Sequence, residues 1–185
     1  TEFEYLCRPL LSIIIDDDVI HKGHNLYAKP VSRTADFSTN NFLVIGQCGT
    51  DANYFEIFSK PIEELLKLNL ENPKPIKDIY SAIKNSEQCE TIYLFANQVA
   101  SGGKLDGLNK VIKHLTIKKN VVVYDSQLIA ELIYDNIPNQ KIILELIDYL
   151  PTAYQLYLSL SKTNELPALQ DDMVERSEEA TLISH

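Results

Sequence analysis

The spacing of apolar residues divides the chain into alternating helices and strands. Apolar positions at helical intervals predict helices over residues 2–15, 61–70, 76–83, 104–115 and 127–134. Between the first two of these, short apolar runs are interrupted by Gly23, Pro30 and the Asn40-Asn41 pair, a texture typical of two or three strands joined by hairpins. The runs 91–96 and 120–124 are rich in β-branched and aromatic residues and predict buried central strands.

The order of these elements predicts an α/β domain with a mixed sheet. Strands and helices alternate from residue 76 onward, which indicates a parallel part of the sheet built through helical crossovers. Residues 139–161 are predicted to form a helical pair split by Pro151, and the acidic residues beyond Lys162 a flexible tail. We therefore expect an α/β domain over 1–137, a helical extension over 138–162 and a tail over 163–185.

Composition narrows the class of protein. The 185 residues are 45% hydrophobic and 23% charged, as expected for one globular α/β domain with an appendage. No apolar run reaches the length of a membrane span, and Cys7, Cys48 and Cys89 form no Cys-x-x-Cys motif. We expect a cytoplasmic protein without a disulfide framework. Because residue 1 is Thr and the sole methionine is Met173, we expect the chain to be part of a longer protein.

Charge is distributed unevenly around a net value of −9. Acidic residues gather in the last twenty positions, whereas a basic block opposed only by Asp106 is formed by Lys104, Lys110, Lys113, Lys118 and Lys119. If the domain binds a DNA backbone, these lysines are the expected phosphate contacts. The alternative is an ordinary solvated helix face.

The segment around the Asn40-Asn41 turn holds the main candidate site. Asp36 precedes the turn, and the predicted strand Phe42–Gly46 leads to Gln47, so a hairpin would place two oxygen-bearing side chains side by side. Mg²⁺ (or Mn²⁺) accepts one or two such side chains and keeps several waters, which leaves room for a phosphate. Asp36 has a second interpretation as a turn carboxylate that holds the hairpin.

This arrangement resembles the PD-(D/E)XK restriction-endonuclease-like superfamily, in particular its Mrr-like branch, where Gln replaces the second acid. The resemblance covers residues 2 to about 135 and implies a restriction-endonuclease-like mixed sheet flanked by helices. It implies that Asp36 and Gln47 bind the metal and that Glu4, on the first helix, belongs to the catalytic set. From the residues alone, the favoured interpretation of Glu4 is a solvated carboxylate in the first turn of a helix.

The chain departs from the family pattern at the lysine that follows the second ligand, because Gly49 stands there. A lysine helps to activate water and to stabilise charge on the phosphate. Lys60 is the candidate replacement nearest in sequence. The chain is thus interpreted either as an active phosphodiester hydrolase or as a catalytically inactive copy.

The resemblance implies a DNA endonuclease-like effector domain of a restriction or anti-phage defence protein, fused to or associated with an NTPase or sensor domain. The alternative is a non-catalytic DNA-binding or oligomerisation module, with the helical pair 139–161 joining copies into a homo-oligomer. A third hypothesis is a small-molecule nucleotide binder, with its ligand in the crevice beyond the strands that end at Ala96 and Tyr124. The Ser101–Lys104 turn lacks the Walker A pattern, since Gln98 and Leu105 stand at its required Gly and Ser/Thr positions, but such a turn before a helix still suits one phosphate.

Overall fold

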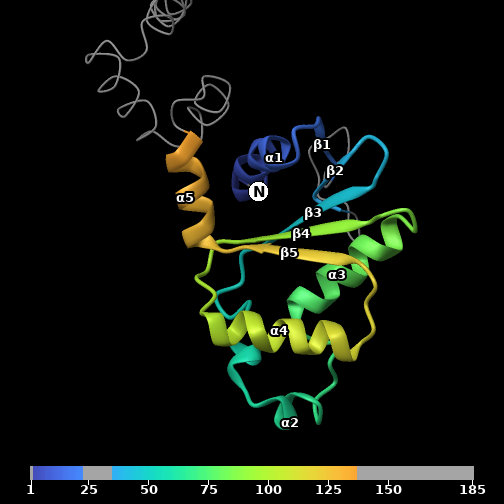
Figure 1. Cartoon of the computed structure of the whole chain (residues 1–185), viewed down its shortest axis with the longest axis vertical. Coiled ribbons are helices and arrows are strands. Elements are labelled where there is room, and N and C mark those ends of the chain that lie inside the picture. The colour runs from blue at the N-terminus through green and yellow to red at the C-terminus, as the bar shows by residue number, and fades with distance from the viewer. Residues whose placement is uncertain (1, 23–34, 137–185) are drawn as a thin grey trace, which may run out of the picture. The chain divides into compact units, whose positions relative to one another are not determined.

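A mixed five-stranded sheet with helices on both faces forms the centre of the domain in the computed structural model, which describes residues 2–22 and 35–136 (Figure 1). In sequence order the elements are α1 (Glu2–Ile15), β1 (Val19–His21), β2 (Phe37–Thr39), β3 (Val44–Gly49), the 3-10 helix η1 (Glu56–Ser59), α2 (Ile62–Leu65), α3 (Lys74–Asn85), β4 (Thr91–Ala96), α4 (Gly102–His114), β5 (Asn120–Tyr124) and α5 (Ser126–Asn136). The predicted α/β class is confirmed. The chain divides into two compact units, Thr1–Leu132 and Ile133–His185, and the features described below lie in the first.

The strands lie in the order β1-β2-β3-β4-β5, with β1, β2 and β3 antiparallel and β3, β4 and β5 parallel. The β2–β3 pair is the hairpin that the Asn40-Asn41 turn predicts. In that turn the Asn41 carboxamide oxygen accepts hydrogen bonds from the Thr39 hydroxyl and from the Leu43 N–H. Phe42 follows in the left-handed region at φ 57°, so β3 begins at Val44 and not at Phe42 as predicted.

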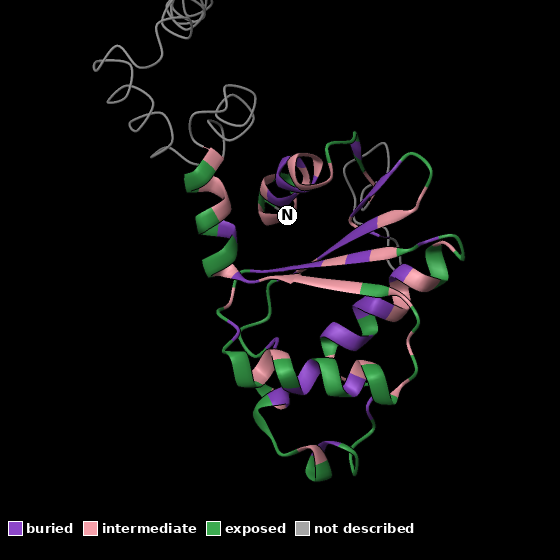
Figure 2. Cartoon of the chain, in the orientation of Figure 1, coloured by how far each residue is buried: buried purple, intermediate pink, exposed green. Residues whose placement is uncertain are grey.

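The two faces of the sheet are covered by different helices. α1 packs on β1 and β3, whereas α3 packs on β3 and β4 from the other face, where η1 and α4 also pack together. Buried residues, purple in Figure 2, occur on the strands and on α1, α3 and α4. The larger cluster lies on the α3 side and includes Ile45, Phe58, Ile79 and Leu94.

Two further differences from the sequence prediction concern helices. The helix predicted over 61–70 is confined to Ile62–Leu65; Pro61 precedes it, and no side chain caps it. The 3-10 helix η1, which lies before it, was not predicted. Asp125 caps α5 as expected, accepting hydrogen bonds from the Leu128 N–H and, across the loop, from the Ala100 N–H. The predicted helical pair 139–161 and the acidic tail lie outside the described residues. Among the described helices, none is long and apolar enough to cross a bilayer.

Candidate functional site

Asp36 and Gln47 occupy facing positions on adjacent chains. The register pairs Phe37 with Gly46, so Asp36, one residue before β2, stands opposite Gln47 in β3. Residues that face each other across an antiparallel pair project from the same face of the sheet. One Asp36 oxygen, Oδ2, accepts a 2.6 Å hydrogen bond from the Cys48 N–H and so fixes the carboxylate against the end of β3.

The face that carries Gln47 is the one covered by α3. Side chains alternate along a strand, so Ile45, Gln47 and Gly49 share a face, and Ile45 belongs to the core cluster beneath α3. Gln47 is buried, and its Nε2 has no hydrogen-bond partner among the described residues; the same holds for the Ser38 hydroxyl, two positions from Asp36. Buried polar groups without partners are uncommon and mark places where a ligand or water completes the bonding.

The carboxyl group of Asp36 is held in an environment that favours its protonated form. Burial raises the pKa of Asp36 from its ordinary 3.8 to about 6, against the opposing effect of the Cys48 N–H. The carboxylates of Glu4 and Asp78 raise the pKa further, and the ammonium of Lys74 lowers it. Four charged groups, from the two helices α1 and α3 and from the loop before β2, therefore act on one another here.

Glu4 reaches this region from the first turn of α1. Its Oε2 lies 3.4 Å from Nε2 of His21 in β1, and the His21 ring stacks on Tyr5 with centroids 4.9 Å apart. Glu4 thus has a structural partner as well as an electrostatic effect on Asp36. Of the residues that the sequence singles out, the structure places Asp36 opposite Gln47 and places Glu4 close enough to act electrostatically on Asp36, although α1 covers the face of the sheet opposite to Gln47.

The ring of Tyr54 packs against Gly49, the position at which the resemblance implies a lysine. A Cβ on Gly49 would lie 2.3 Å from Cε2 of Tyr54, a distance that real contacts do not reach. The Tyr54 hydroxyl donates a 2.8 Å hydrogen bond to Oδ2 of Asp78, and Asp78 also pairs with Lys74 one turn earlier on α3. Burial, followed by the Asp78 charge, raises the pKa of Tyr54 well above its ordinary range. We call Asp36, Gln47, Tyr54, Lys74 and Asp78 the Asp36 cluster.

Lys60, the predicted replacement, lies elsewhere. It lines a cavity between η1, α2 and α4, and it is not among the charges that shift the pKa of Asp36, whereas Lys74 is. The sequence carried one signal for Lys74, its i,i+4 spacing from Asp78. It carried none for Tyr54, which lies in an irregular loop.

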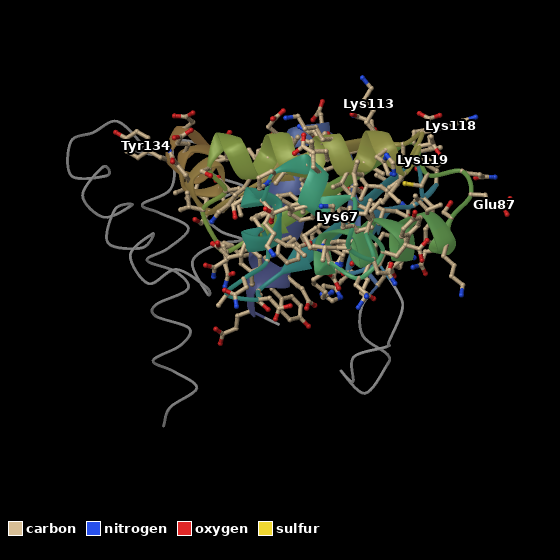
Figure 3. All side chains as sticks on the ribbon, turned by 90° about the horizontal axis from the view of Figure 1, so that it is seen from below. Lys67, Glu87, Lys113, Lys118, Lys119 and Tyr134 are labelled. Carbon is tan, nitrogen blue, oxygen red and sulfur yellow. The ribbon has the colours of Figure 1, made fainter. Side chains whose placement is uncertain are left out.

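The lysines that the sequence predicts to bind nucleic acid differ in whether their charge is already paired within the domain. Lys104 pairs with Glu56, Lys110 lies 2.6 Å from Asp106, and Lys119 donates to the Glu87 carbonyl at 3.0 Å. Lys113 and Lys118 have no ion pair within the described part of the chain. Figure 3 shows Lys113, Lys118 and Lys119 near the same end of the domain.

The described residues contain no group of three or more His, Cys, Asp or Glu side chains placed to hold a metal ion. A cation at the predicted site would therefore depend on Asp36 and Gln47. Comparison with protein-family models gave no match, and neither did comparison with curated proteins or with solved structures. The site is interpreted from its own geometry.

Proposed function

We propose that this domain is a divalent-cation-dependent DNA endonuclease of the PD-(D/E)XK type, with Lys74 in place of the motif lysine. The observation that carries the proposal is the facing pair Asp36–Gln47 with the Lys74 ammonium close enough to act on the Asp36 carboxyl. The effector domain of a cytoplasmic restriction or anti-phage defence protein is the role that the family resemblance implies for such an endonuclease.

The donor set suits Mg²⁺ or Mn²⁺. Oδ2 of Asp36 is taken by the Cys48 N–H, whereas Oδ1 has no hydrogen bond among the described residues. The nitrogen and oxygen of a carboxamide are interchanged by a half-turn of the group, so the unpartnered end of Gln47 supplies an oxygen equally well. Bound there, the cation would polarise a phosphate and lower the pKa of a water.

The chain's own residues supply the rest of the site. Asp78 holds the Lys74 ammonium, and the Lys74 side chain is 50% exposed, so it is accessible to a phosphate that approaches from solvent. An ammonium so placed stabilises negative charge that develops on the phosphate. Lys113 and Lys118 are the basic-block residues best able to contact a DNA backbone, because the described residues do not neutralise them.

The test is nicking of supercoiled plasmid by the full chain with Mg²⁺ or Mn²⁺, comparing the unmodified protein with Asp36→Asn, Lys74→Gln and Lys60→Gln. We expect Asp36→Asn and Lys74→Gln to reduce nicking by about a hundredfold or more, and Lys60→Gln to leave it unchanged. Circular dichroism of each variant checks folding. Full nicking by Asp36→Asn would reject the site.

A second function is favoured by the Tyr54 ring, which fills the lysine position as a core residue does. On this view the domain binds DNA without cutting it. DNA binding that weakens with salt and with Lys113→Gln/Lys118→Gln, together with no nicking by the unmodified chain, would support it.

A further inference from the structure

A cavity of about 410 Å³ lies between η1, α2 and the first turns of α4, apart from the Asp36 cluster. Lys60, Lys104 and Lys110 line it, with Asp106 as the acidic lining residue. Its other walls include Phe58, Ile62 and Leu65. The volume lies in the range of small-molecule sites. Because Lys104 pairs with Glu56 and Lys110 with Asp106, Lys60 is the lining lysine without an ion pair among the described residues, and it stands beside an apolar wall.

Two glycines at the start of α4, Gly102 and Gly103, make no close packing contact with the described residues. A Cβ added to Gly102 or Gly103 would meet no atom within 4 Å, and neither residue has a positive φ. By contrast, a Cβ on Gly107, in the same helix, would lie 2.2 Å from the Phe58 carbonyl oxygen. Glycine gives the unfolded chain more conformational freedom than alanine does, so Gly102 and Gly103 reduce stability without a compensating contact within the described structure.

Gly103 differs from Gly102 in lining the cavity. An absent side chain is useful where a ligand must approach the backbone closely. Lys60 adds a cation that has no ion pair among the described residues, and the Ser59 and Ser101 hydroxyls also line the cavity. These groups are the ones that recognise a phosphate monoester.

We propose that this cavity binds a small phosphorylated molecule, with its phosphate between Lys60 and the backbone at Gly103 and its apolar part against Ile62 and Leu65. The site is separate from the proposed nuclease centre and does not depend on it. Its ligand class is a nucleoside monophosphate or a molecule of similar size.

The test is isothermal titration calorimetry of the full chain with adenosine 5′-monophosphate and with inorganic phosphate, comparing Gly103→Ala, Gly102→Ala and Lys60→Gln. Thermal unfolding is followed by circular dichroism, and we expect both alanine variants to raise the melting temperature. Of these two variants, we expect Gly103→Ala alone to weaken binding, by about tenfold. Lys60→Gln should weaken binding of both probes by a similar factor. Opposite changes in stability and affinity at Gly103 would identify a ligand contact.

Three results would overturn the proposal: no binding of either probe at millimolar concentration, equal affinity of Gly103→Ala and Gly102→Ala, or unchanged affinity of Lys60→Gln. If Gly103→Ala failed to fold, the reasoning about open space would itself be wrong, and Lys60→Gln would decide the ligand. Duplex DNA could also displace the monophosphate. If Lys60→Gln then lost binding of both DNA and the monophosphate, the cavity would be part of a DNA-binding surface instead.

Discussion

Replacing Asp36 by Asn is expected to stabilise the folded protein at neutral pH. Burial raises the pKa of Asp36 from 3.8 to about 6. At about 1.4 kcal/mol per pKa unit, ionising this carboxyl in the folded state costs up to about 3 kcal/mol. Asparagine avoids that cost and still accepts the Cys48 N–H, although the bond to a neutral acceptor is weaker, so we expect a net gain of about 1–2 kcal/mol.

The gain depends on pH in a defined direction. Below about pH 4 the carboxyl is protonated in both the folded and the unfolded chain, so its contribution to stability is the same as that of a neutral group. Between about pH 4 and pH 6 the unfolded chain loses the proton while the folded chain keeps it, so the free energy of unfolding falls as pH rises. Above about pH 6 the full cost is present. In Asp36→Asn this fall is absent.

Urea denaturation followed by far-UV circular dichroism at half-unit steps from pH 4 to pH 8 measures both effects, since the chain has no Trp for fluorescence. Asp51→Asn is the matched control, because Asp51 is exposed and the same charge is removed. The reasoning would be refuted if, at pH 7, Asp36→Asn were no more stable than the unmodified chain while the slope of the unfolding free energy against urea stayed unchanged.

Three further predictions test the surroundings of the site. Gly49→Ala should destabilise the domain by about 1–3 kcal/mol in urea denaturation, because its Cβ would overlap the Tyr54 ring; equal stability would show that the ring moves freely. Gly49→Lys should therefore unfold the chain at a lower urea concentration and not increase nicking, an expectation that a more active variant would contradict. Tyr54→Phe should lower the free energy of unfolding by about 1 kcal/mol through loss of its bond to Asp78, and should raise the pKa of Asp78 as followed by carboxyl NMR; an unchanged pKa would place Asp78 outside the influence of Tyr54.

The sheet was largely predictable from sequence because its strands carry strong local signals. Thr91–Ala96 and Asn120–Tyr124 form strands with the predicted bounds, since their apolar runs have β-branched or aromatic residues at most positions. The sequence predicted this strand over Phe42–Gly46, whereas β3 begins two residues later, at Val44, and continues to Gly49. Glycines normally interrupt strands, but Gly46 and Gly49 are inside β3, where each makes room for an aromatic ring from another element.

The candidate site was predictable only where it is local. The turn fixes the register, so the pairing of Asp36 with Gln47 follows from the hairpin and needs no knowledge of the rest of the fold. The Tyr54–Asp78–Lys74 network joins a loop to α3 through tertiary contacts, and the Tyr54 residue is separated from Asp78 by 24 positions. Proximity in sequence therefore favoured Lys60, and folding placed Lys60 in the cavity lined by η1, α2 and α4.

Gly49 in β3, where the proposed family would carry a lysine, and Lys74 on α3 are structurally connected. The Tyr54 ring prevents any side chain at position 49, and the hydroxyl of the same ring bonds to Asp78, whose other oxygen pairs with Lys74. In an inactive copy the same bonds would serve packing alone, because a buried tyrosine hydroxyl and a buried carboxyl both need hydrogen-bond partners. A remodelled catalytic site needs both features, since an ammonium serves through its position and not through the element that carries it. The nicking assay of Lys74→Gln therefore distinguishes the two, since only a catalytic ammonium is needed for cutting while the fold is retained in both.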